Sequence, residues 1–151
     1  MSEMEVIDKL VKTHGNQCVL EKFSPSDRRI FVTVNKECFK DAIQFLKTEG
    51  FAHLSAITGL EVGDEIELLY HLNKEGAVVT VRLKVPLSEI IVPTITDIIP
   101  GSNLYERELH DLLGVKFPGH PNLARLILSD DWPENIYPLR KRGRSKETSE
   151  Q

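Results

Sequence analysis

Near its centre the chain reads Glu65-Ile-Glu-Leu-Leu-Tyr-His-Leu-Asn-Lys-Glu-Gly-Ala-Val-Val-Thr-Val-Arg-Leu-Lys-Val85. On both sides of the polar loop Asn73–Gly76 apolar residues alternate with polar ones, which is the period of a strand with one buried face. Gly76 ends the loop at a position where hairpins usually need a positive φ. With a further strand expected at Phe51–Leu60, broken by Gly59, this stretch predicts a three-stranded antiparallel meander with one face open to water.

Helical periodicity flanks this meander on both sides. The clearest helix is expected at Glu37–Glu49, where apolar residues recur at i, i+3, i+4 and i+7 and Gly50 follows as a stop. The other expected elements are a helix between Ser2 and Gly15, strands at 17–23 and 28–34, a helical turn at Thr94–Ile99, and a helix at Leu104–Leu113 that Asn103 and Glu106 would cap and Gly114 would end.

The order of these elements is α-β-β-α-β-β-β-α, followed by a long segment rich in proline and glycine. Hairpin connections favour antiparallel pairing, so the sequence predicts an α+β fold: a mostly antiparallel sheet with helices on one face and a long C-terminal arm. We expect an α+β domain over 1–114, an extended arm over 115–140 and a disordered basic tail over 141–151. A length of 151 residues suffices for one such domain.

Charge is distributed unevenly along the chain. Residues 1–139 carry 14 Lys/Arg and 21 Asp/Glu, a net of −7, and residues 140–151 carry 5 and 2, a net of +3, which together give the overall −4. An acidic domain of this kind is not expected to bind nucleic acid. The basic tail is interpreted either as a solvated end or as a segment that docks onto an acidic partner or anionic lipid.

Several classes of site are excluded by missing motifs. The sequence contains no Gly-rich phosphate loop, no Cys-x-x-Cys and no His-x-x-x-His, and the acidic start and the lack of a long apolar run argue against a secretory signal and a membrane span. Cys18 and Cys38 are too few for a disulfide framework or an iron–sulfur site. We expect them to be buried free thiols in a reducing compartment.

The segment Tyr105–Asp111 is dense in charge. On a helix, Glu106 would pair with His110 and Arg107 with Asp111, because both pairs are four residues apart. Three interpretations stay open: a solvated helix face laced with ion pairs, acid–base chemistry by the carboxylates of this helix, or a protein interface with preset donors and acceptors.

The residues after this helix form an unusual arm. Within Gly114–Leu123, Pro118 and Pro121 stiffen the backbone and Gly119 lets it turn, so the chain itself fixes the shape of this stretch. The apolar run Leu126–Leu128 and Trp132 follow. These side chains must be covered either by their own domain or by a partner protein.

A resemblance emerges from these residues. The pattern Tyr105-Glu-Arg-Glu-x-x-Asp-Leu-Leu-Gly-Val115, then Phe117, Gly119-His-Pro-Asn-Leu123, Arg125 and Pro138-Leu-Arg-Lys141 resembles the 30-kDa subunit family of respiratory complex I. Related members occur in energy-converting NiFe hydrogenases and in F420H2 dehydrogenases. The resemblance is firmest over residues 104–141.

The resemblance implies a function. It implies a non-catalytic, peripheral subunit of a membrane-associated electron-transfer complex, without a cofactor or metal of its own, on the cytoplasmic face of the membrane and soluble when isolated. It would dock and stabilise a hydrogenase-like large subunit and a small iron–sulfur subunit. The interface residues implied by the motif are Glu106, Arg107, Glu108, Asp111, Gly114, His120, Pro121, Asn122, Leu123, Arg125, Arg140 and Lys141.

Two departures from the family pattern stand out. Many members carry two basic residues after the Asn-Leu, whereas here Ala124 precedes Arg125. The segment after Arg140 is also short, which we expect to limit wrapping around a neighbour. Two other functions remain as alternatives: an α+β adaptor outside any redox complex, and a small acid–base enzyme that uses Glu106, Glu108 and Asp111.

Overall fold

The computed structural model describes residues 3–15 and 17–141. The expected cap at Ser2 and most of the expected disordered tail, 142–151, lie outside the described residues. The elements in chain order are α1 (Glu3–His14), β1 (Val19–Ser26), β2 (Arg29–Val34), η1 (Lys36–Cys38), α2 (Phe39–Thr48), β3 (His53–Val62), β4 (Glu65–Lys74), β5 (Ala77–Pro86), η2 (Pro100–Ser102) and α3 (Asn103–Leu113).

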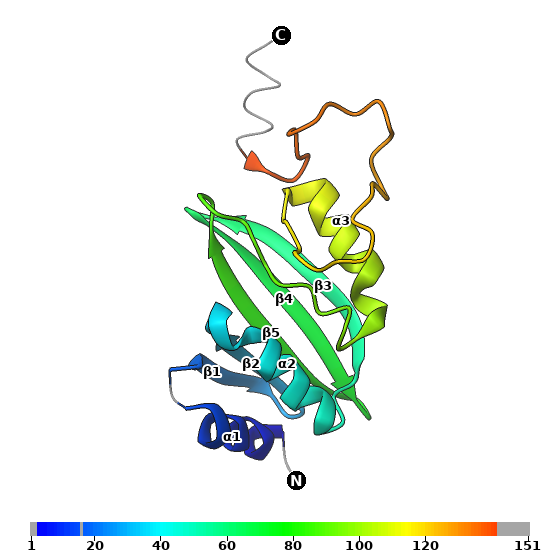
Figure 1. The fold of residues 1–151 in the computed structure, drawn as a ribbon. Helices are drawn as coiled ribbons and strands as arrows, with labels where there is room; N and C mark the ends of the chain where they lie inside the picture. The colour runs from blue at the N-terminus through cyan, green and yellow to red at the C-terminus, as the bar shows by residue number, and fades with distance from the viewer. Residues whose placement is uncertain (1–2, 16, 142–151) are drawn as a thin grey trace.

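The five strands form one sheet in the order β1-β2-β5-β4-β3 (Figure 1). The pairs β1–β2, β3–β4 and β4–β5 are antiparallel, so the predicted meander and the mostly antiparallel α+β fold are confirmed. The pair β2–β5 is parallel, and no pattern along the chain indicated it. It arises because β5, the third strand of the meander, pairs with the edge of β2 that β1 does not occupy.

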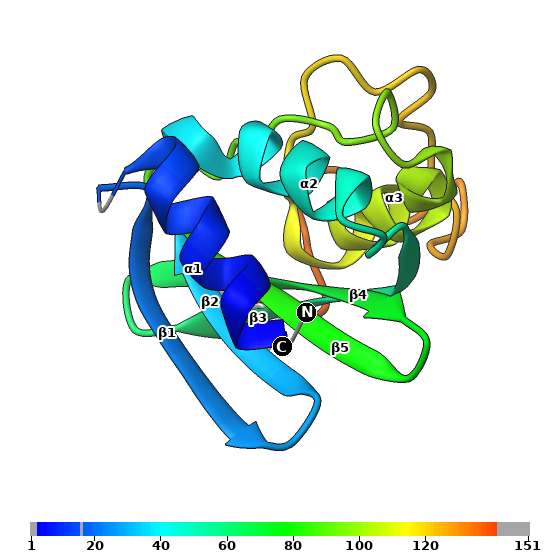
Figure 2. The same cartoon turned by 90° about the horizontal axis from the view of Figure 1, so that it is seen from below.

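The three helices lie on the same face of the sheet, as predicted (Figure 2). The alternating residues of β4 and β5 that point to the helices, such as Leu68, Tyr70 and Val81, are fully buried. The opposite face carries polar groups, among them His71, whose two ring nitrogens lie within 3.1 Å of Thr58 Oγ1 and 3.0 Å of Thr80 Oγ1. Burial lowers the pKa of His71, so the ring is neutral at pH 7.

Strand β3 passes through Gly59 without the predicted break. A Cβ at this glycine would lie 2.5 Å from Leu113 Cδ1 and 2.6 Å from Leu109 Cδ2. Gly59 therefore lets α3 approach the sheet closely, rather than interrupting the strand. The strand continues to Val62, and Gly63 with φ 58° makes the turn to β4.

The prediction of free thiols is wrong. Cys18 and Cys38 are joined by a disulfide, with their Cα atoms 5.5 Å apart. The two residues lie at the open end of the β1–β2 hairpin, where the Asn35 N–H also donates to the Cys18 carbonyl. A separation of 20 residues along the chain did not reveal this proximity, because it depends on how the hairpin pairs.

Candidate functional site

Helix α3 carries most of the residues singled out by the sequence motif. It packs on β3 and is preceded by η2, so that its N-cap is Ser102 and not the predicted Asn103. Its end is as predicted: Gly114, with φ 77°, closes the helix, and its N–H donates to the His110 carbonyl. Such a left-handed residue after a helix favours glycine.

Glu106 lies on the buried side of α3. Its carboxylate is fully buried and accepts hydrogen bonds from Thr94 Oγ1 at 2.6 Å and from the Ile95 N–H at 3.0 Å. Burial raises the pKa of Glu106 and outweighs these hydrogen bonds, which act in the opposite direction. The predicted pairing with His110 is wrong, because the His110 ring donates from Nδ1 to the Val115 carbonyl instead.

The carboxylate of Asp111 binds the backbone of the arm. Its Oδ2 accepts from the N–H groups of Leu126, Ile127 and Leu128 at 2.8, 2.8 and 3.2 Å. Burial alone would raise the pKa of Asp111, but these three hydrogen bonds lower it below its usual value. Asp111 is therefore a charged anchor and not an exposed acid.

Arg107 holds the same stretch from the other side. Its Nε donates to the Ala124 carbonyl at 3.0 Å and its Nη2 to the Arg125 carbonyl at 2.9 Å. The predicted ion pair between Arg107 and Asp111 is wrong, because both side chains bind the arm backbone instead. Arg107 and Asp111 therefore do not form the solvated, ion-paired helix face that was one of the three interpretations of this segment.

The start and the end of the arm are also tied to the domain. Near the start, His120 donates from Nε2 to the Asn103 carbonyl at 3.1 Å and accepts at Nδ1 from the Asn122 N–H. At the end, Arg140 Nε donates to Glu61 Oε1 at 3.0 Å. Between these points the chain loops out and returns to the C-terminal end of α3 (Figure 1).

The return of the arm depends on close packing at Gly114. The Leu139 N–H donates to the Leu112 carbonyl at 3.0 Å, and a Cβ at Gly114 would lie 2.6 Å from Tyr137 Cε2. The loop encloses a hollow of about 250 Å³, beside which Trp132 donates from its indole nitrogen to the Ile136 carbonyl. The arm is thus a shaped loop with fixed ends.

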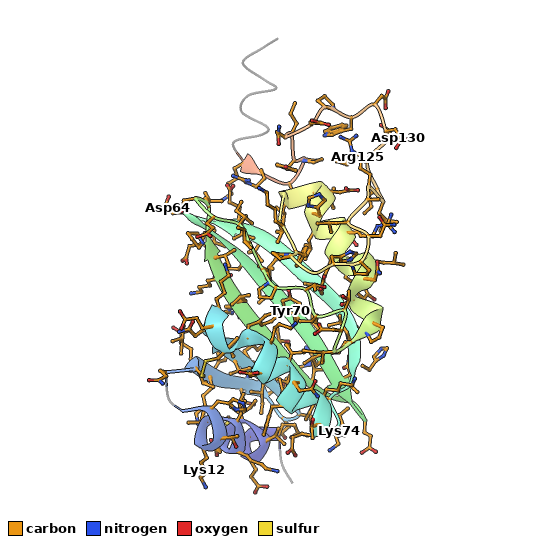
Figure 3. The ribbon with its side chains drawn as sticks, in the orientation of Figure 1. Lys12, Asp64, Tyr70, Lys74, Arg125 and Asp130 are labelled. Atoms are coloured by element: carbon orange, nitrogen blue, oxygen red, sulfur yellow. A yellow bond between two sulfur atoms is a disulfide. The ribbon has the colours of Figure 1, made fainter. Side chains whose placement is uncertain are left out.

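Other residues of the motif lie at or near the surface. The side chain of Glu108 is half-buried and makes no hydrogen bond or ion pair within residues 3–15 and 17–141, and Pro121 and Asn122 are exposed. Leu123 packs partly against the core, and Lys141 is exposed at the end of the described chain. Arg125 lies on the outer part of the molecule, where Nη1 donates to the Ser129 carbonyl (Figure 3).

The sequence reasoning missed some of the exposed apolar residues beside this site. Among these, Leu104 on α3 is 55% exposed and Leu139 on the arm 45%. The sequence did single out the run Leu126–Leu128 as needing cover, and Leu126 and Ile127 are 42% and 52% exposed although Asp111 fixes their backbone. Thr94 and Glu61, which anchor Glu106 and Arg140, were missed as well. Only a three-dimensional contact identifies them, since no sequence spacing links them to α3.

Two kinds of arrangement are absent from the described residues. Within residues 3–15 and 17–141 no three His, Cys, Asp or Glu side chains gather as metal ligands would. None of the helices in the same ranges has the length and apolar character needed to cross a bilayer.

The fold and site together define a class: a small α+β domain whose last helix uses its charged side chains to fix a long C-terminal arm. A family model described as "Respiratory-chain NADH dehydrogenase, 30 Kd subunit" matches residues 32–149. The chain belongs to this family, as its motif predicted.

Two named relatives match this chain over most of its length. The "Membrane-bound hydrogenase subunit beta" of Pyrococcus furiosus is 32% identical over 148 residues, covering 93% of this chain and 86% of the relative. The "NADH-quinone oxidoreductase subunit 5" of Thermus thermophilus is 31% identical over 126 residues, covering 74% of this chain and 60% of the relative. These relatives are subunits of oxidoreductases, of complex I and of a membrane-bound hydrogenase.

The fold also matches a solved assembly. A chain in "Structure of the membrane-bound sulfane sulfur reductase (MBS), an archaeal respiratory membrane complex" superposes with a TM-score of 0.79 at 25% sequence identity. The match covers 98% of this chain and 91% of that chain, so it includes the arm.

Proposed function

We propose that the protein is a non-catalytic peripheral subunit of a membrane-associated electron-transfer complex. In this proposal it docks and stabilises a hydrogenase-like large subunit and a small iron–sulfur subunit, and reaches the cytoplasmic face of the membrane through them. The domain over 1–114 provides the base, the arm over 115–140 provides the contact, and the tail over 141–151 adds positive charge.

The observation that carries this proposal is the way α3 presents the arm. Asp111 and Arg107 fix the backbone of residues 124–128 while the side chains of Leu126 and Ile127 stay exposed. A backbone held by charged groups loses little further entropy when a partner covers its side chains. Preorganised apolar side chains of this kind suit a stable contact between subunits.

We define the arm surface as a set of six exposed or half-buried residues of α3 and the arm that lie in or beside the family motif. Its motif members, Glu108, Pro121 and Asn122, were among the interface residues implied by the sequence. Among the other predicted interface residues Lys141 is exposed as well, whereas Glu106 and Asp111 are buried and shape the arm instead of facing outward. The arm surface comprises Leu104, Glu108, Pro121, Asn122, Leu126 and Ile127.

The two alternative functions are less well supported by the geometry. An acid–base enzyme would need carboxylates directed at a substrate, but Glu106 binds Thr94 and Ile95, and Asp111 binds three backbone N–H groups. An adaptor outside any redox complex would show the same arm, so only its partner distinguishes it.

Co-purification tests the proposal. The tagged protein is co-expressed with the hydrogenase-like large subunit and the small iron–sulfur subunit encoded with it, and the amount of large subunit retained is measured. We expect stoichiometric retention, and a loss of at least about tenfold for the double variant Leu126→Asp/Ile127→Asp, because a carboxylate buried without a partner opposes binding by more than about 1.4 kcal/mol.

Leu20→Asp is the matched control. Leu20 is a similarly exposed leucine, 59% accessible, but it lies on β1. We expect this variant to retain the large subunit and both variants to melt like the parent protein. Absence of the large subunit from the parent preparation would contradict the proposal. Equal retention of the large subunit by both variants would mean that the contact lies outside the arm.

A further inference from the structure

The Cys18–Cys38 disulfide lies at the least firmly held part of the sheet. Strand β1 is an edge strand that pairs only with β2, and every residue of β1 after Val19 is exposed. Its pairing with β2 has two register irregularities, one around Leu20 and one between Phe23 and Ser26. A strand with so little buried surface depends on the contacts at its two ends.

One end of the β1–β2 hairpin is closed by its turn and the other by the disulfide. The turn passes through Arg28, which has a φ of 65°. At the open end, Cys18 precedes β1 and Cys38 precedes α2, so the bond ties the start of the edge strand to the start of a helix on the core. Beside its backbone pairing with β2, β1 is attached by exposed side-chain contacts, among them the ion pair Lys22–Asp8 at 2.7 Å, the Ser24 hydroxyl that donates to the Arg29 carbonyl, and the stacked rings of Phe23 and Phe31.

The two sulfur atoms differ in their surroundings. Cys18 is 7% exposed, whereas Cys38 is more exposed and occupies the N-cap of α2. Its side chain makes no capping hydrogen bond in the disulfide state, and the Phe39 N–H at the start of α2 donates to the Lys36 carbonyl. The start of a helix stabilises a thiolate.

We propose that Cys18 and Cys38 form a reversible thiol–disulfide site that clamps β1 to the sheet. This inference is independent of the proposed function. A thiolate of a small dithiol attacks Cys38 Sγ, the S–S bond breaks, and Cys18 Sγ leaves with the electron pair and takes up a proton. The second thiolate of the dithiol then displaces Cys38, so that the dithiol is oxidised to its disulfide and the protein gains two thiols.

The expected consequence is a local one. Without the clamp, β1 opens from β2 more often, while β3, β4 and β5 keep their buried apolar contacts. Closing a loop of about 20 residues restricts the unfolded chain, so reduction lowers the melting temperature as well, by on the order of 5–10 °C.

The test uses the full chain, purified without reductant and then divided into oxidised and dithiothreitol-reduced halves. Hydrogen exchange is measured by mass spectrometry on peptides covering β1 and, as an internal reference, β4. We expect exchange to become at least tenfold faster in β1 on reduction, with little change in β4. In the reduced half, iodoacetamide should modify Cys38 faster than Cys18, because Cys38 is the more exposed of the two.

The double variant Cys18→Ser/Cys38→Ser is the control. It should exchange like the reduced protein in β1 and should not respond to dithiothreitol. The proposal is overturned if the air-purified protein has two alkylatable thiols, if β1 exchanges at the same rate in both halves, or if β4 accelerates as much as β1. The last result would mean that the bond supports the whole fold and not the edge strand.

Discussion

The central sheet and the C-terminal arm are held by different kinds of contact. In β4 and β5, side chains such as Leu68, Leu72 and Val81 are fully buried against the helices, and no single one of them decides the course of the strand. The arm between residues 123 and 140 has a backbone held mainly by polar side chains of α3, and the Arg140 side chain at its end donates to Glu61. Apolar burial is spread over many residues, whereas these hydrogen bonds are few and directional.

The two regions are therefore expected to fail in different ways. Loss of one buried side chain weakens the whole sheet cooperatively, because its neighbours share the core. Loss of one anchor should free a defined part of the arm and leave the sheet folded. Substitutions in α3 therefore separate the two regions experimentally.

The largest effect is expected from Asp111→Ala. The substitution removes the acceptor of three backbone N–H groups, and a hydrogen bond to a charged acceptor contributes a net of about 1.5–3 kcal/mol, although contributions that share one acceptor do not simply add. We expect the arm to detach and the free energy of unfolding to fall by about 2–4 kcal/mol. Trypsin should cut after Arg125 much faster, and the amides of residues 126–128 should lose their protection from exchange.

Asp130→Ala serves as the control for this variant. Asp130 is an exposed acid on the looped-out part of the same arm (Figure 3). It should leave both the cleavage rate and the melting temperature unchanged. Protected amides at residues 126–128 in the Asp111 variant would mean that apolar packing, and not the carboxylate, holds the arm.

A smaller effect is expected from Gly114→Ala. The φ of 77° is unfavourable for alanine, and the new Cβ would lie 2.6 Å from Tyr137 Cε2. We expect a loss of about 1–3 kcal/mol from the strained backbone and the displaced ring. Denaturant unfolding measures it. Gly101→Ala is the comparison, because a Cβ there meets no atom within 4 Å; equal losses at the two glycines would argue against the contact with Tyr137.

A third variant, Arg107→Ala, separates an anchor from a partner contact. It removes two hydrogen bonds to the carbonyls of Ala124 and Arg125, so we expect a loss of about 1–2 kcal/mol and faster exchange at residues 126–128. If Arg107 instead served a partner directly, the isolated protein would melt normally and only co-purification would suffer. Lys116→Ala, which removes an exposed cation after α3, should change neither readout.

The same contrast explains how much of the molecule the sequence predicted. The alternation in Glu65–Val85 and the helical period in Glu37–Glu49 identified the meander and α2, because burial on one face leaves a regular pattern. The stop at Gly114 was predicted from an equally local rule, since a left-handed residue after a helix favours glycine. Rules that use only neighbouring residues therefore predicted the meander, α2 and the end of α3.

The contacts of α3 could not be predicted in this way. A spacing of four residues shows that Arg107 and Asp111 can meet, but backbone groups 15 to 18 residues further along the chain compete for both side chains. The partner of Glu106 comes from a loop 12 residues earlier. The disulfide and the parallel pair β2–β5 were missed for a related reason, because each depends on how the strands pair in the finished sheet.

The smallest effect, and one of opposite sign, is expected from Glu106→Gln. Glu106 is a buried carboxylate near Thr94 and Tyr70, and the hydroxyl of Tyr70 has no hydrogen-bond partner within the described residues. A glutamine can still accept from the Ile95 N–H, and its amide can donate to a hydroxyl, without a buried charge. We expect the variant to be more stable at pH 7, by less than about 1 kcal/mol.

The pH dependence gives this prediction its sign. Because the folded pKa of Glu106 is raised above 4.5, the folded protein binds this proton more tightly than the unfolded chain does. Its contribution to stability is complete below the unfolded pKa and is lost as the pH rises through the folded pKa. Asp111 behaves in the opposite way: its pKa is lowered, so its contribution is present above 3.8 and is lost as the pH falls through the lower folded value.

The two carboxylates therefore act in separate pH windows, and unfolding measured from about pH 3 upward can resolve them. The stability advantage of Glu106→Gln over the parent should be absent at acid pH and should grow as the pH rises past the folded pKa. Glu108→Gln, a half-buried neighbour without a side-chain hydrogen bond within residues 3–15 and 17–141, should follow the parent curve throughout. A Glu106→Gln variant less stable than the parent at pH 7 would mean that the ionised carboxylate is needed to hold the loop at Thr94 and Ile95 in place. The packing of α3 on this loop would then depend on a charge, as the attachment of residues 126–128 to Asp111 does.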